Sequence, residues 1–231
     1  MKKLFLVGLI LILLASCVTT GTRNSYSEEE KREALELLAS DMLSSRERDS
    51  RIDTSFFEEL LPESYTAYYG YCPMYQSLAS AYTSALSELI SPLLYDIYPV
   101  LVEAFYEVIS SDDLDTMIES PEGLTDVLQN SVAREIYSLL MEEVGALSDE
   151  LDKAFSESYA IFMSVRASYL NLASVGENVI LPEPKAIGVD MLAFAAEDAL
   201  FSMMAEDEVE LKSRIPESPD SLYSVFWEDS I

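Results

Sequence analysis

Histidine is absent from the 231-residue sequence, and glycine and cysteine are scarce, with 7 and 2 residues. Without histidine the chain has no Ser-His or Cys-His nucleophile pair and no zinc or iron site with a histidine ligand. The two nearest glycines, Gly176 and Gly188, lie twelve positions apart, which excludes a P-loop and a dinucleotide-binding glycine motif. We therefore expect no cofactor, no metal ion and no catalytic residue, and predict that the protein is not an enzyme.

Basic residues are also few, since 14 Lys and Arg stand against 42 Asp and Glu, for a formal net charge of −28. No Lys or Arg occurs from Ile52 to Ala133, where 14 acidic residues lie. Because binding to nucleic acid needs clustered basic side chains, we expect no nucleic-acid partner. The acidic surface would attract basic partners or divalent cations; the simpler interpretation is that it maintains solubility.

The abundant carboxylates leave one catalytic possibility, a hydrolase that uses two carboxyl groups alone. Acidic runs on helices are, however, usually solvated surfaces. We interpret Glu142-Glu143 and Glu206-Asp207-Glu208 in this way, and the hydrolase is the least supported of the functions considered.

The first sixteen residues have the form of a secretory signal peptide. Lys2 and Lys3 precede an apolar stretch, 4–14, which is too short to span about 30 Å of hydrocarbon at about 1.5 Å per residue. The tetrapeptide Leu14-Ala15-Ser16-Cys17 that follows resembles a bacterial lipobox. We therefore expect cleavage before Cys17 and lipidation of Cys17; the alternative is an ordinary signal peptide with an incidental cysteine.

A lipidated Cys17 would attach the protein to a membrane without crossing it, because several acyl chains together hold a protein stably. We expect a bacterial envelope location, with the domain facing the periplasm or the exterior. The residue after the cysteine is Val18 and not aspartate. This resembles envelope lipoproteins that are exported to the outer membrane rather than retained at the inner membrane. Cys72 then has no partner for an internal disulfide, and is either an inert half-buried thiol or a site of pairing between molecules.

After the signal peptide (1–16) and a flexible tether (17–26), the sequence predicts one all-α domain, 27–231. Ser27 and Glu30 form a capping-box signature at its start, and apolar residues then recur at helical spacing, again from Met74 onward.

The charged stretch 46–51 is expected to be a solvated connector. Ser91-Pro92 should stop one helix and start the next, and Pro99 should either kink that helix or start another. Only 174–186, with two prolines and a glycine, is expected to be a loop. We predict an irregular bundle of about six to eight helices. Its C-terminal helix, 189–212, should be largely buried because it is apolar over most of its circumference.

Two segments resemble a family of bacterial envelope proteins, the domain of unknown function numbered four-one-nine-seven. They are residues 105–139 (FYEVISSDDLDTMIESPEGLTDVLQNSVAREIYSL) and residues 198–215 (DALFSMMAEDEVELKSRI). The resemblance covers roughly 30–227 and implies an exported, all-helical domain, without implying any catalytic residue. The chain departs from the family in its acidity, its tyrosine-rich segment and its extended C-terminus.

A tyrosine-rich segment is the best candidate for a recognition site, because tyrosine is enriched where proteins bind partners. The candidate partner-binding residues are Tyr65, Tyr68, Tyr69 and Tyr71. The alternative is that these side chains pack over the core of the bundle.

Two functions follow as hypotheses. The first is a membrane-anchored, non-catalytic helical protein with an interaction or structural role, whose protein partner the sequence does not identify. The second is a helical module for a small apolar or carbohydrate ligand, with its pocket beside the 189–212 helix and the tyrosine-rich segment. A cavity lined by Phe201, Met203 and Met204 would favour the second function, and a solid core the first.

Overall fold

A computed structural model describes residues 26–48, 51–66, 69, 73–111, 114–173, 183–214 and 221–227. Within these residues all regular structure is helical, which confirms the predicted all-α fold. The helices are α2 (Glu28–Arg48), α3 (Thr54–Glu58), α4 (Glu63–Thr66), α5 (Pro73–Ile90), α6 (Leu94–Ser111), α7 (Leu114–Glu119), α8 (Gly123–Ala146), α9 (Ser148–Ala173) and α10 (Val189–Ser213), with 3₁₀ turns η1 (Ser91–Leu93) and η2 (Leu222–Phe226). The predicted signal peptide and most of the predicted tether lie outside the described residues.

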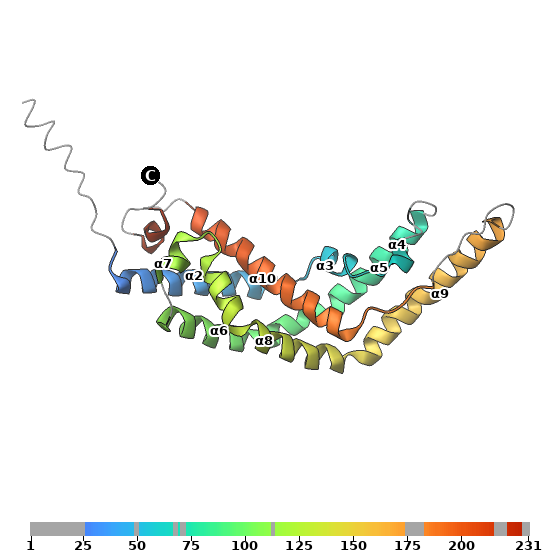
Figure 1. Cartoon of the computed structure of the whole chain (residues 1–231), viewed down its shortest axis with the longest axis horizontal. Coiled ribbons are helices and arrows are strands. Elements are labelled where there is room, and N and C mark those ends of the chain that lie inside the picture. Colours follow the sequence, from blue (N-terminus) through green and yellow to red (C-terminus); the bar gives the residue numbers. More distant parts are fainter. Residues whose placement is uncertain are drawn as a thin grey trace, which may run out of the picture.

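The helices form an elongated, curved bundle (Figure 1). Helices α8 and α9 follow each other along its lower edge and bend where they join, at Leu147. At one end α2, α6, α7, α10 and η2 gather around α8, and at the other end α5 packs against α9, with α3 and α4 beside α5. The molecule therefore has a broad end, which carries the first helix and the last turn, and a narrower end.

The helix starts follow from local capping. At the start of α2 the Ser27 amide donates to Glu30 Oε2 (2.8 Å) and the Glu30 amide donates to Ser27 Oγ (3.2 Å), which confirms the predicted capping box. At the start of α3 the Ser55 amide donates to Asp53 Oδ1 (2.8 Å), and hydrogen bonding by the side chain and the amide of Ser55 lowers the pKa of Asp53. Each contact satisfies an amide that has no partner within its own helix.

Proline marks the boundary between α5 and α6, whereas a second proline lies inside α6. Ser91-Pro92 was predicted to stop one helix and start the next, and the structure places η1 there, between α5 and α6. Pro99, for which a kink and a new helix start were both open, lies inside α6, which continues through it. The Ser91 hydroxyl accepts from the Ile52 amide (2.9 Å) and so fixes the segment before α3 against η1, directly after α5.

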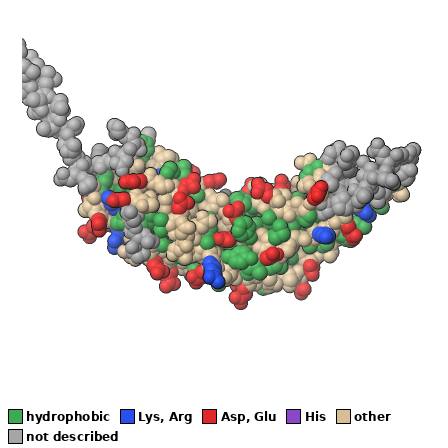
Figure 2. Space-filling view, in the orientation of Figure 1, with side chains coloured by type: hydrophobic (Ala, Val, Ile, Leu, Met, Phe, Trp, Pro, Cys, Tyr) green, Lys and Arg blue, Asp and Glu red, His purple; other side chains and the backbone are tan. Residues whose placement is uncertain are grey.

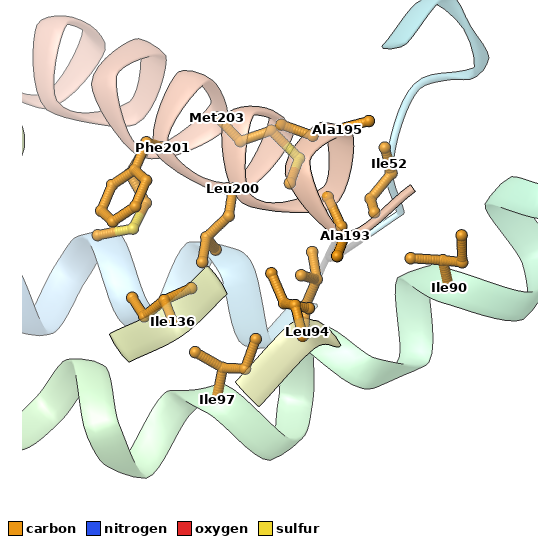
Figure 3. Packing of buried hydrophobic residues seen from close by; sticks show 14 of the residues in the cluster. Ile52, Ile90, Leu94, Ile97, Ile136, Ala193, Ala195, Leu200, Phe201 and Met203 are labelled. Carbon is orange, nitrogen blue, oxygen red and sulfur yellow. The ribbon is translucent and has the colours of Figure 1, made fainter. Parts of the chain in front are cut away.

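The core joins residues distant in the sequence. Thirteen of the 25 residues of α10 are buried, in agreement with the prediction that this helix is largely buried. Figure 3 shows Leu200 of α10 pointing toward Ile136 of α8 and Ile97 of α6. Phe201, Met203 and Met204 are also buried in this cluster and line neither of the two hollows described below.

A buried ion pair on α10 connects three helices. Glu208 Oε1 lies 2.6 Å from Lys212 Nζ, and their exposed fractions are 0% and 9%. Glu208 also accepts from the amides of Leu124 (2.9 Å) and Thr125 (2.7 Å) in the first turn of α8, whose own N-cap provides no side-chain bond. A carboxylate at this place satisfies orphan amides and is stabilised by the helix dipole.

Lys212 bonds to the C-terminal end of another helix, α7. Its ammonium donates to the carbonyls of Met117 (2.6 Å) and Ser120 (2.7 Å), at the C-terminus of α7, where a cation is favourable. Burial lowers the pKa of Lys212, while Glu208 acts in the opposite direction. The pair therefore holds α7, α8 and α10 in one arrangement.

Two interpretations of charged segments were wrong. Glu208 and Asp207 were expected on a solvated face, but both are buried. The stretch from Arg46 was expected to be a solvated connector, but α2 extends to Arg48 and Arg46 donates twice to Asp207, at 2.6 and 2.8 Å. The physical reason is similar in both cases, because another helix supplies hydrogen-bond donors to each buried carboxylate: Arg46 of α2 to Asp207, and two amides of α8 to Glu208.

One stretch of the described residues, Met74–Ser110, is long and apolar enough to cross a membrane by length and composition alone. In the structure it comprises most of α5, η1 and most of α6, and 44% of its most apolar window is buried inside the bundle. A core helix of a soluble bundle has the same composition, so the stretch is weak support for a membrane span.

Candidate functional site

Of the predicted partner-binding tyrosines, Tyr65 belongs to the core. Its side chain is 0% exposed in α4 and lies edge-on to Phe162 of α9, with ring centroids 4.7 Å apart. It also stacks with Tyr82 of α5 at 6.0 Å, and Tyr75 of α5 contacts Phe162 at 4.6 Å. These rings join α4, α5 and α9, so for Tyr65 the structure agrees with the packing alternative.

Burial also changes the ionisation of these phenols. Burial raises the pKa of Tyr65 and of Tyr82 above the usual value. The Tyr82 hydroxyl accepts a long bond from the Ile187 amide (3.5 Å). Within the described part of the chain, the buried Tyr65 hydroxyl has no hydrogen-bond partner.

The remaining candidates are only partly placed. Tyr69 is half-buried, packs against the core, and has its pKa raised by burial. Tyr68, Tyr71, Cys72 and the lipidation candidate Cys17 lie outside the described residues. A tyrosine patch at this position therefore stays a prediction for Tyr68, Tyr69 and Tyr71.

A groove between α2 and α6 is the best-defined hollow of the described surface. Its volume is about 340 Å³. The residues that line it are Glu36, Ala39, Ser40, Leu43, Ser44, Tyr98, Val102, Phe105, Tyr106 and Ile109. We call it the α2–α6 groove. It lies at the broad end of the molecule and differs from the predicted site beside the 189–212 helix.

Apolar side chains of the groove remain open to solvent. Val102 is 40% exposed and Tyr106 63%, although Phe105 and Ile109 between and beyond them are buried. Tyr95, two turns before Val102 on α6, is 45% exposed and contacts Tyr98 ring to ring, with centroids 5.5 Å apart. Apolar contact area that the fold leaves uncovered marks a surface available to a partner or ligand.

Acidic side chains flank this apolar floor. Glu36 lines the groove from α2, and Glu33, three positions earlier, is exposed on the same helix. Glu103 is exposed on α6 beside Val102. Figure 2 shows one face of the whole molecule, on which Asp and Glu far outnumber Lys and Arg and hydrophobic side chains gather near the middle.

The second hollow lies against α10 and is shallower, with a volume of about 480 Å³. It is lined by Glu122, Ser202, Ala205, Glu206, Val209 and Glu210. Among the described residues, no group of three or more Cys, Asp or Glu side chains is arranged to hold a metal ion. This acidic surface therefore gives no support for a metal site.

Comparison with protein families, curated proteins and solved structures finds no match to the chain. The resemblance to the envelope family thus stays a prediction, as do the absence of catalysis and the membrane anchor.

The α2–α6 groove was not predicted from the sequence, although α6 carries a signal for it. A surface helix needs an apolar stripe of about 100° to cover a core. In α6 the apolar positions extend beyond the buried Leu101, Phe105 and Val108 to Val102 and Tyr106. This excess width indicates apolar surface that the core does not use.

Proposed function

We propose that the protein is a lipid-anchored bacterial envelope protein whose helical domain has a non-catalytic interaction or structural role. The observation that carries the proposal is the sequence Leu14-Ala15-Ser16-Cys17 directly after an eleven-residue apolar stretch. Lipidation of this cysteine would hold the chain at the membrane surface, since several acyl chains give stable attachment.

The fold is compatible with such an anchor. Tyr26, the first described residue, bonds through its hydroxyl to Ser224 Oγ of η2 (2.8 Å), at the broad end of the molecule. The nine residues from Cys17 to Ser25 can span at most about 30 Å. An anchor at Cys17 would therefore keep the broad end, with the α2–α6 groove, close to the membrane and leave the α5–α9 end farther from it.

The charge of the domain supports attachment through the lipid alone. At −28, or −30 after the two signal-peptide lysines are removed (12 basic and 42 acidic residues), the chain repels anionic headgroups. Without acyl chains it should leave the membrane.

A second candidate function, binding of a small apolar or carbohydrate ligand, is favoured by the α2–α6 groove itself. Its volume of about 340 Å³ lies within the range of ligand pockets, about 300–1,000 Å³. Its lining includes three aromatic rings, Tyr98, Phe105 and Tyr106. The affinity for a ligand of this class should not depend on the flanking carboxylates. This independence distinguishes such a ligand from a charged partner.

The experiment for the anchor is fractionation of bacterial cells that produce the protein or its Cys17→Ser variant. We expect the unchanged protein in the membrane fraction, resistant to washing with salt, and the variant in the soluble fraction. A matched control is Cys72→Ser, which should stay in the membrane fraction. Equal membrane attachment of all three proteins would contradict the proposal.

A further inference from the structure

We infer that the α2–α6 groove binds a basic amphipathic helix of another protein. This inference rests on the interaction role proposed above, and it names the surface and the chemistry of the partner.

The shape of the groove fits a helix. On α6 its lining extends from Tyr98 to Ile109, a length of about 16 Å at about 1.5 Å per residue, or three helical turns. Val102 and Tyr106 occupy successive turns there and present uncovered apolar surface, 40% and 63% exposed. Leu43 and Ala39 of α2 form the opposite wall. A row of apolar side chains spaced by three and four positions, as on one face of a helix, can fill such a space.

The charge around the groove selects a basic partner. Glu33 and Glu36 lie along α2 and Glu103 along α6, and all three are exposed. Within the described part of the chain, no ion pair joins any of the three to a basic side chain. Arg32, four positions before Glu36, offsets part of the charge of α2, whereas α6 has neither Lys nor Arg. Lysines on both sides of an apolar stripe would complement these carboxylates.

Other occupants fit less well. A second copy of this chain carries the same net charge of −28 and would be repelled, as would anionic lipid. A neutral small ligand would use the apolar floor but gain nothing from the three glutamates. The basic helix uses both features.

The test is binding of a designed 18-residue helical peptide, with a leucine stripe flanked by lysines, to the full-length protein in neutral phosphatidylcholine nanodiscs. A second peptide has glutamate at each lysine position. We expect the lysine peptide to bind and the glutamate peptide not to bind. Empty nanodiscs measure adsorption to the lipid.

Variants of the exposed residues then locate the contact. Val102→Ser with Tyr106→Ser should weaken binding at least about tenfold, because the apolar anchors are lost. Glu36→Gln with Glu103→Gln should weaken it about threefold. Matched controls away from the groove, Phe194→Ser and the pair Glu142→Gln with Glu150→Gln, should leave the affinity unchanged; all of these residues are exposed.

Equal affinity for groove variants and controls would show that net charge alone attracts the peptide, and would overturn the inference. Absence of binding, or equal binding of the glutamate peptide, would overturn it as well. None of these results affects the fractionation of Cys17→Ser, so failure of the groove and failure of the anchor are distinguishable.

Discussion

At the scale of single residues, the most consequential side chains are the two charges that α10 buries. Glu208 and Lys212 have the same spacing, four positions, as Glu157 and Lys153, which form an exposed pair 3.9 Å apart on α9. The spacing is therefore the same in the two helices, with the order of the two charges reversed. What differs is the set of partners, because Glu208 and Lys212 bond to the ends of α8 and α7.

Removing one member of the buried pair should be far more damaging than removing its exposed counterpart. We expect Glu208→Gln to lower the free energy of unfolding by about 3–5 kcal/mol, because Lys212 is left as an uncompensated buried charge. Glu157→Gln should change it by less than about 0.5 kcal/mol. Urea denaturation followed by circular dichroism measures both, and a similar effect of the two changes would contradict the assigned role.

The hydroxyl of Tyr65 gives a second prediction at this scale. Because it is buried without a partner among the described residues, Tyr65→Phe should leave stability unchanged or raise it by up to about 1 kcal/mol. Tyr65→Ala should cost about 3–5 kcal/mol, as expected for a large core ring. If thermal unfolding shows a clear loss for Tyr65→Phe, the hydroxyl has a partner that this account lacks.

The sequence could predict the composition of these sites but not their burial. Tyr65 was left with two interpretations, a surface patch or a core position, because the choice depends on Phe162, 97 positions later. Likewise, nothing near Glu208 indicates that the first turn of α8 lacks a cap of its own. Both outcomes depend on contacts between distant segments.

At the scale of the helices, local signals were sufficient for most boundaries. Ser27 with Glu30, Ser91-Pro92 and the helical spacing from Met74 correctly indicated where α2, α6 and α5 lie. The end of α2 was placed too early, because Arg46 and the residues around it are charged in sequence but held by Asp207 in the fold. Local propensity predicts an element, whereas packing decides how far it extends.

Two glycines of α8 should respond oppositely to alanine. A Cβ at Gly123 would lie 2.5 Å from the Thr116 carbonyl oxygen and 2.9 Å from Met117 Cα, so Gly123→Ala should destabilise by about 1–3 kcal/mol. At Gly145, apart from the adjacent residues and the neighbouring backbone of α8 itself, no atom of the described residues lies within 4 Å of the added Cβ. Gly145→Ala should stabilise α8 by about 0.4–1 kcal/mol, as expected where the backbone conformation suits alanine.

Differential scanning calorimetry of the two variants measures both changes in stability directly. The opposite order of melting temperatures would show that α7 and α8 do not approach each other as the structure places them.

At the scale of the whole molecule, two features dominate: an acidic surface and an elongated bundle whose narrower end is joined by aromatic rings. The charge was read directly from composition, and the all-α class from periodicity. The curved shape and the α2–α6 groove were not predicted, since both depend on how helices far apart in the sequence pack together.

The buried tyrosines predict how the fold responds to alkali. Burial raises the pKa of Tyr65 and Tyr82 in the folded state, so unfolding lets these phenols ionise at lower pH. Their contribution to stability is complete below about pH 10, the ordinary value, and decreases as the pH rises above it. The urea midpoint should therefore fall between pH 9 and about 11, and it should fall less for Tyr82→Phe. An equal decrease in that variant would contradict this assignment.

The membrane anchor is the claim on which the proposed location and role depend, and its most direct test is the mass of the N-terminal tryptic peptide of the protein purified from bacterial membranes. We predict a peptide Cys17–Arg23 whose cysteine carries acyl lipid, with residues 1–16 removed. An unmodified peptide that still contains the sequence before Cys17, or one that begins after it, would contradict the account.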